Sequence, residues 1–119
     1  MMKHFMKPIA LKKILASAAS FLLVSSVSYA ADVNENWTKH CVSCHAKDGK
    51  GQTKAGRAAG VKDLTDAKYQ ATLTDEQMFK QIKEGMKDKN GKEKMKPYGG
   101  VLSDDEIKDL VKFVRGLKK

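Results

Sequence analysis

The sequence has few of the residues that cross-link small proteins or bind structural metal ions. Cys41 and Cys44 are its two cysteines among 119 residues. A disulfide between residues this close would close too short a loop to constrain the unfolded chain much. A four-ligand zinc site needs further Cys or His, and the histidines after residue 30 are His40 and His45. The cysteine pair therefore needs another use.

Arginine and strand-like patterns are also scarce. Arg57 and Arg115 are the two arginines, and the lysines alternate with acidic residues. This composition and the lack of a DNA- or RNA-recognition motif argue against a nucleic-acid partner. No segment after residue 30 alternates convincingly between apolar and polar residues. That excludes the βαβ setting in which thiol–disulfide Cys-x-x-Cys centres usually occur.

The N-terminal segment lacks acidic residues and has the features of an export signal. Four lysines open the chain, no acid precedes Asp32, and residues 14–31 are 18 uncharged positions that approach the length of a membrane span. Ser28 and Ala30 are small residues at the two positions that signal peptidase inspects. The sequence predicts a cleaved secretory signal peptide at 1–30 and no membrane span after cleavage. A retained anchor is the alternative.

Cleavage would leave 89 residues, 31–119, which suit a single domain with a small core. The formal charge falls from +9 to +5, because the removed segment holds four lysines and no acid. A modest positive charge steers a protein toward acidic partner surfaces. Export implies an oxidising compartment, which we expect to be the periplasm.

Three main helices are predicted, and two of them open with capping boxes. Thr74 pairs with Gln77 at one start, and Ser103 with Glu106 at the other. The predicted helices cover residues 33–41, 75–84 and 104–117, with a short helical turn at 67–71. The remaining segments, 46–63 and 86–101, are predicted loops. Loops this long inside a small domain need something large to wrap around, such as a buried cofactor.

The segment Cys41-Val42-Ser43-Cys44-His45 has the Cys-x-x-Cys-His spacing of a haem c attachment site. Two thiols three residues apart can reach the two vinyl groups of a haem and form thioether bonds. The adjacent His45 then lies beneath the ring, where its imidazole can bind the iron. The sequence therefore predicts one covalent haem c held by Cys41, Cys44 and His45.

This motif, the glycines of residues 49–51, a methionine loop and a capped C-terminal helix resemble class I cytochrome c, in particular its short bacterial monohaem members. The resemblance covers about residues 33–117. It implies an all-α fold in which three main helices and long loops wrap around one covalent haem. It also implies that the N-terminal helix crosses the C-terminal helix through Trp37, Leu110 and Phe113.

A haem that only transfers electrons has a second axial ligand, and a methionine thioether raises its potential. Met78 lies on a predicted apolar helix face, where methionine is usually core filler. Met86 follows the end of that helix, and Met95 lies in a loop two residues before Pro97. The resemblance implies Met95, because the family's axial methionine precedes a Pro-aromatic pattern and the last helix. Met86 is the alternative.

The other ring nitrogen of His45 needs a hydrogen-bond acceptor. Many family members use the carbonyl of a proline in the loop after the motif, but this chain has no proline between His45 and Pro97. We expect a backbone carbonyl within residues 56–61 to take this role.

These predictions combine into a periplasmic single-electron carrier, monomeric, with one His/Met-ligated haem c and no enzymatic activity. Its partners would be redox proteins with acidic docking surfaces, attracted by lysines of the methionine loop. Those lysines could equally be a solvated loop surface. Two other functions stay open: a haem c subunit of a larger oxidoreductase complex, and a gas- or peroxide-binding haem protein from which Met95 dissociates. The lysines are Lys87, Lys89, Lys92, Lys94 and Lys96.

Overall fold

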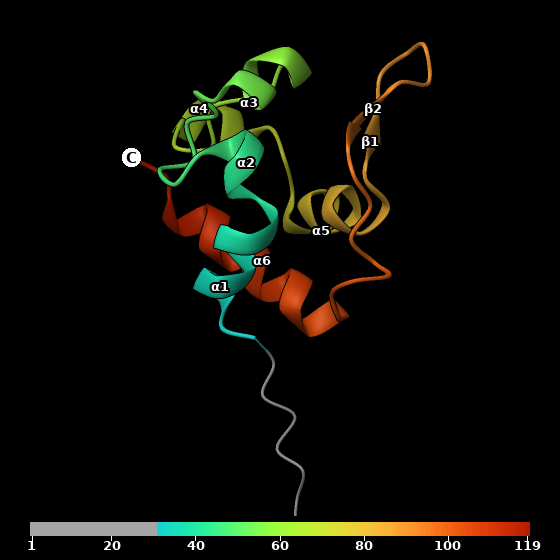
Figure 1. The fold of residues 1–119 in the computed structure, drawn as a ribbon. Helices are drawn as coiled ribbons and strands as arrows, with labels where there is room; N and C mark the ends of the chain where they lie inside the picture. Colours follow the sequence, from blue (N-terminus) through green and yellow to red (C-terminus); the bar gives the residue numbers. More distant parts are fainter. Residues whose placement is uncertain (1–30) are drawn as a thin grey trace, which may run out of the picture.

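The computed structural model describes residues 31–119, so the predicted signal peptide lies outside the described residues. The described chain is mainly helical, with one short two-stranded ribbon (Figure 1). This confirms the all-α fold class. The elements are α1 Val33–His40, α2 Val42–His45, α3 Lys54–Ala59, α4 Ala67–Ala71, α5 Asp75–Glu84, β1 Met86–Lys87, β2 Glu93–Met95 and α6 Asp104–Gly116.

The two longest helices begin as their sequences predict. At the start of α5 the hydroxyl of Thr74 accepts the amide of Gln77, whose side chain accepts the amide of Thr74 in return. Ser103 and Glu106 form the same capping box at the start of α6. Each box satisfies two amides that would otherwise have no helical partner. Local sequence therefore determines where both helices begin.

Two short elements form where the sequence predicts only loops. Helix α3 begins after Thr53, whose hydroxyl accepts the amide of Gly56, and ends at Gly60 in a left-handed conformation. Strands β1 and β2 pair antiparallel around the turn at Asn90 and Gly91. The loop prediction is wrong for these two stretches. Both elements are too short to show a periodic pattern and depend on a cap or a turn instead.

The core lies where α6 meets α1 and α5. Trp37 of α1 packs against Phe113 of α6, with ring centroids 5.0 Å apart. Beside this contact the buried Asn36 donates a hydrogen bond to Glu106, at 2.9 Å. The predicted contact of the N-terminal and C-terminal helices is thus confirmed. The buried apolar residues are Trp37, Met78, Leu102, Ile107, Leu110, Val111 and Val114.

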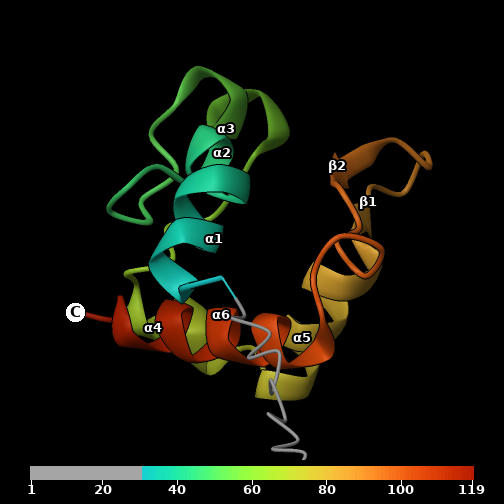
Figure 2. The same ribbon diagram turned by 60° about the horizontal axis from the view of Figure 1, so that its bottom comes forward.

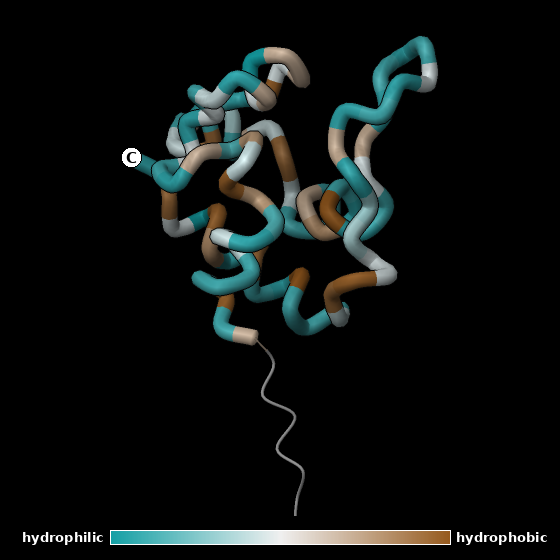
Figure 3. Tube along the Cα trace, viewed as in Figure 1, coloured by the Kyte–Doolittle hydropathy of each residue, from teal (hydrophilic) through white to brown (hydrophobic). Residues whose placement is uncertain are grey.

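Helix α6 forms the base of the molecule, as Figure 2 shows. Helices α1, α2 and α3 rise from one end of α6, and α5 with the β1–β2 ribbon rises from the other (Figure 2). Short apolar stretches occur along α6 and on the elements that face it, whereas the tip of the ribbon is hydrophilic (Figure 3). Within residues 31–119, no helix is long and apolar enough to cross a membrane.

Candidate functional site

A cavity of about 500 Å³ lies between the two rising sides of the fold. Its volume falls within the range of about 300–1,000 Å³ that is usual for cofactor sites. Apolar side chains of α6 line it, as do the predicted attachment motif on one side and the ribbon methionines on the other. The motif residues that line it are Cys41, Ser43, Cys44 and His45, and the methionines that line it are Met78, Met86 and Met95.

The attachment motif lies at a break in the first helix. The amides of Cys44 and His45 both bond to the carbonyl of Cys41, at 3.3 and 2.9 Å. Helix α1 therefore ends at His40, and α2 restarts as a single turn from Val42. The predicted helix over residues 33–41 is correct in position but ends one residue earlier. The break frees the carbonyl of His40 from its normal helical donor, the amide of Cys44.

Helix α3 packs closely on the turn that carries the motif. The hydroxyl of Thr53 donates to the carbonyl of Ser43, at 2.8 Å. A Cβ atom added to Gly56 would lie only 2.2 Å from the carbonyl oxygen of Cys44. Only glycine allows α3 to approach this closely, so Gly56 helps to hold the thiol-bearing turn in position.

The two thiols are free and half-buried at the cavity. Burial raises the pKa of Cys41 to about 11, and the nearby Cys44 adds to this effect. Because the thiolate is the form that oxidises and forms disulfides, Cys41 is poorly reactive on its own at neutral pH.

His45 lies against Trp37, with ring centroids 6.0 Å apart and ring planes 28° apart. Burial lowers the pKa of His45, which favours the neutral imidazole that metals bind. Within residues 31–119 its Nδ1 atom is buried and has no hydrogen-bond partner. The predicted acceptor within residues 56–61 is therefore not found. The carbonyl of Gly56 accepts the amide of Val61 instead, at 3.0 Å.

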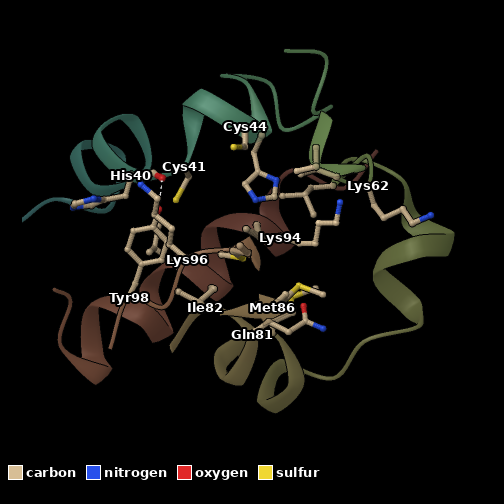
Figure 4. Close-up of a pocket in the computed structure, with 18 of the residues that line it drawn as sticks. His40, Cys41, Cys44, Lys62, Gln81, Ile82, Met86, Lys94, Lys96 and Tyr98 are labelled. Carbon is tan, nitrogen blue, oxygen red and sulfur yellow. Dashed lines mark hydrogen bonds between the residues drawn. The ribbon is translucent and has the colours of Figure 1, made fainter. Parts of the chain in front are cut away.

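The ribbon brings two sulfur atoms to the opposite side of the cavity. Met86 and Met95 are paired across β1 and β2, and paired residues project from the same face of a ribbon. Figure 4 shows Met86 across the cavity from Cys44. Met86 is 39% exposed and Met95 is half-buried, whereas Met78 is buried in the core, as predicted.

One contact at the cavity was not predicted. The hydroxyl of Tyr98 donates to the carbonyl of His40, at 2.9 Å (Figure 4). The sequence carries no signal for this bond, because its acceptor is a backbone atom freed by the helix break.

The residues around the cavity fit a haem. Trp37 lines the cavity, and its Nε1 atom is buried without a partner in the described part of the chain. Buried polar atoms are nearly always paired in complete sites. Two thiols, an imidazole and a thioether surround the same mainly apolar space, and these are the groups that attach and ligate haem c.

Comparisons with known proteins agree with this fit. A protein-family model described as "Cytochrome C oxidase, cbb3-type, subunit III" matches residues 29–114. Among solved structures, the chain is similar to the KustC0563 c-type cytochrome, with a TM-score of 0.65 and 36% identity over 74% of this chain and 99% of that chain. A mutant of that cytochrome gives a TM-score of 0.62 and 36% identity, over 73% of this chain and 99% of that chain. No curated protein gave a match to the sequence.

Proposed function

Since the chain belongs to the cytochrome c oxidase, cbb3-type, subunit III family of haem c proteins, we propose that it is a periplasmic single-electron carrier. In this proposal residues 1–30 are a cleaved signal peptide and residues 31–119 form one domain. Cys41 and Cys44 would hold a single haem c, and His45 and Met95 would be the ligands of its iron. The observation that supports this most directly is that all four side chains line one cavity.

Each of these side chains has a defined task. Each thiol would be joined to the haem by a thioether bond, formed by addition of its S–H across one vinyl group, so attachment would consume no oxidant. The bound haem would supply a one-electron couple. His45 would provide a neutral imidazole, and the thioether of Met95 would favour the reduced state. With both residues bound, electron transfer would need little rearrangement of the chain.

The backbone around Met95 supports its choice over Met86. The Cα atom of Gly85 approaches so closely that an added Cβ would lie 2.5 Å from the carbonyl oxygen of Met95. The amides of Tyr98 and Gly99 bond to carbonyls in the last turn of α5, at 2.9 and 3.0 Å. Met95 is therefore held on a fixed backbone. Met86 is more exposed.

The lysines of the methionine loop support docking to acidic redox partners. Within residues 31–119, none of the five is engaged in an ion pair. In the described chain, Asp88 forms no ion pair with these lysines. Its carboxylate instead accepts hydrogen bonds from the backbone amides of Asn90 and Lys92, at 2.8 and 2.9 Å. These bonds help to lower the pKa of Asp88. Lys94 and Lys96 lie at the cavity itself, where a partner would approach the haem.

The docking proposal is tested by the rate of electron exchange with an acidic redox protein. We expect the second-order rate to fall steeply as salt increases. Lys94→Glu should lower the rate several-fold at low salt, whereas Lys112→Glu on α6 serves as the matched control and should change it little. A rate that does not depend on salt would contradict docking through these lysines.

The carrier function itself is tested by redox titration of the purified protein. We expect a reversible one-electron transition, and carbon monoxide binding by the reduced protein at neutral pH that is slow because Met95 must first dissociate. Rapid carbon monoxide binding would favour the gas-binding alternative. N-terminal sequencing of the exported protein should begin at Ala31, and a retained Met1 would contradict cleavage.

The name of the matching family favours a second function, that of a haem c subunit in a larger oxidoreductase complex. Fractionation of cells that make the protein naturally distinguishes the two. A free carrier is found in the periplasmic fraction at the size of one domain. A subunit is found with membranes and co-purifies with a larger oxidoreductase.

A further inference from the structure

Tyr98 connects the two sides of the cavity through two different groups. Its backbone amide bonds to the carbonyl of Ile82 in α5, at 2.9 Å. Its side-chain hydroxyl bonds to the carbonyl of His40 at the end of α1, also at 2.9 Å. One residue thus ties the side that carries Met95 to the side that carries the attachment motif.

The acceptor is available because of the helix break at Cys41. Since the amide of Cys44 bonds to Cys41 rather than to His40, the carbonyl of His40 needs another donor. The Tyr98 and His40 rings also meet edge to face, with centroids 5.5 Å apart. Figure 4 shows the two residues beside Cys41. Burial raises the pKa of Tyr98, so its hydroxyl keeps the proton that it donates.

This bond has no parallel elsewhere in the described chain. Within residues 31–119, it is the one hydrogen bond that joins the segment 85–101 to the segment 31–66. Helix α6 contacts both sides at the base of the cavity, and the Tyr98 hydroxyl adds a direct bond between them.

We propose that Tyr98 is a positioning residue that keeps Met95 on the iron by fixing the separation of the two sides of the cavity. This proposal rests on the proposed function, because it requires Met95 to be an axial ligand. Without the hydroxyl, the methionine strand is free to swing outward from α6, and the thioether leaves the iron more often. The haem stays attached through its thioether bonds.

The test compares Tyr98→Phe with Thr72→Val, in the holoprotein. Thr72 lies outside the cavity lining, and its hydroxyl also donates one hydrogen bond to a backbone carbonyl, that of Tyr69, at 2.7 Å. We expect Tyr98→Phe to increase the rate of carbon monoxide binding to the reduced protein by about two- to tenfold, the effect of losing one hydrogen bond. Its sulfur-to-iron absorption band should also weaken. Thr72→Val should match the wild type in both measurements.

Equal carbon monoxide rates in Tyr98→Phe, Thr72→Val and the wild type would overturn the positioning role. That outcome is distinct from failure of the proposed function, in which the wild type itself would show no sulfur-to-iron band. A second measurement needs no variant. In the reduced, diamagnetic protein the Tyr98 hydroxyl proton should exchange slowly with water. Fast exchange would also overturn the proposal.

Discussion

Met86 lies directly opposite Met95 across the β1–β2 ribbon, so both thioethers face the cavity that the attachment motif lines. The two residues therefore form a matched pair for assigning the sixth ligand. We expect Met95→Ala to abolish the sulfur-to-iron charge-transfer absorption and to lower the reduction potential. Met86→Ala should keep the band. Loss of the band in Met86→Ala, with a normal spectrum in Met95→Ala, would assign the ligand to Met86 instead.

Alanine variants of two glycines with positive φ can distinguish the effect of backbone strain from the effect of displacing Met95. Gly85 and Gly91 have φ values of +75° and +80°, so alanine costs about 1–2 kcal/mol of unfolding free energy at either site. Only at Gly85 does an added Cβ collide with the backbone of Met95. We expect Gly85→Ala to shift or weaken the sulfur-to-iron band, and Gly91→Ala to leave it unchanged. Identical spectra for the two variants would show that Gly85 does not help to position Met95.

Alanine substitutions at the two helical glycines Gly56 and Gly116 should have opposite effects on the free energy of unfolding. A Cβ at Gly56 would collide with the carbonyls of Cys44 and Gly51, whereas the space around Gly116 is open. Gly56→Ala should lower the free energy of unfolding by about 1–3 kcal/mol or more. Gly116→Ala should raise it by up to about 1 kcal/mol, because alanine favours helix. Chemical denaturation followed by circular dichroism measures both, and a neutral Gly56→Ala would disprove the close packing of α3 on α2.

Acid should weaken the contact between α1 and α6. Hydrogen bonds from Asn36 and the Ser103 amide lower the pKa of Glu106. A carboxyl whose pKa is lower in the folded state stabilises the fold above its unfolded pKa of about 4.3, and this contribution is lost as the pH falls through the folded pKa. Glu106→Gln keeps the capping box. We expect this variant to lose less unfolding free energy than the wild type as the pH falls below about 4.3.

The exposed Glu76 in the first turn of α5 provides the control for this prediction. Glu76→Gln should leave the slope of unfolding free energy against pH close to that of the wild type. If Glu106→Gln and the wild type lose stability with the same slope, the bond between Asn36 and Glu106 does not contribute to acid stability.

The parts of the fold that the sequence predicted are those set by neighbouring residues. The capping pairs that begin α5 and α6 lie three residues apart, and the attachment motif spans five consecutive residues. Helix α3 also has local signals in Thr53 and Gly60. It was missed because its six residues are too few for an apolar period.

The parts that could not be predicted depend on contacts between distant segments. The bond between Tyr98 and His40 joins residues 58 positions apart and uses a backbone acceptor. The acceptor expected for Nδ1 of His45 within residues 56–61 is not formed in the described chain. The sequence could nominate Met95 by its position before Pro97. It could not show that Met86 faces the same cavity, because that follows from the register of the ribbon.

Covalent attachment of haem through Cys41 and Cys44 is the claim on which the account depends most. It is tested by mass spectrometry of the purified protein from a host that can attach haem, together with its digested peptides. The account predicts a mass equal to residues 31–119 plus one haem, with the added mass on the peptide that contains both cysteines. A colourless protein with the mass of the bare chain would contradict it.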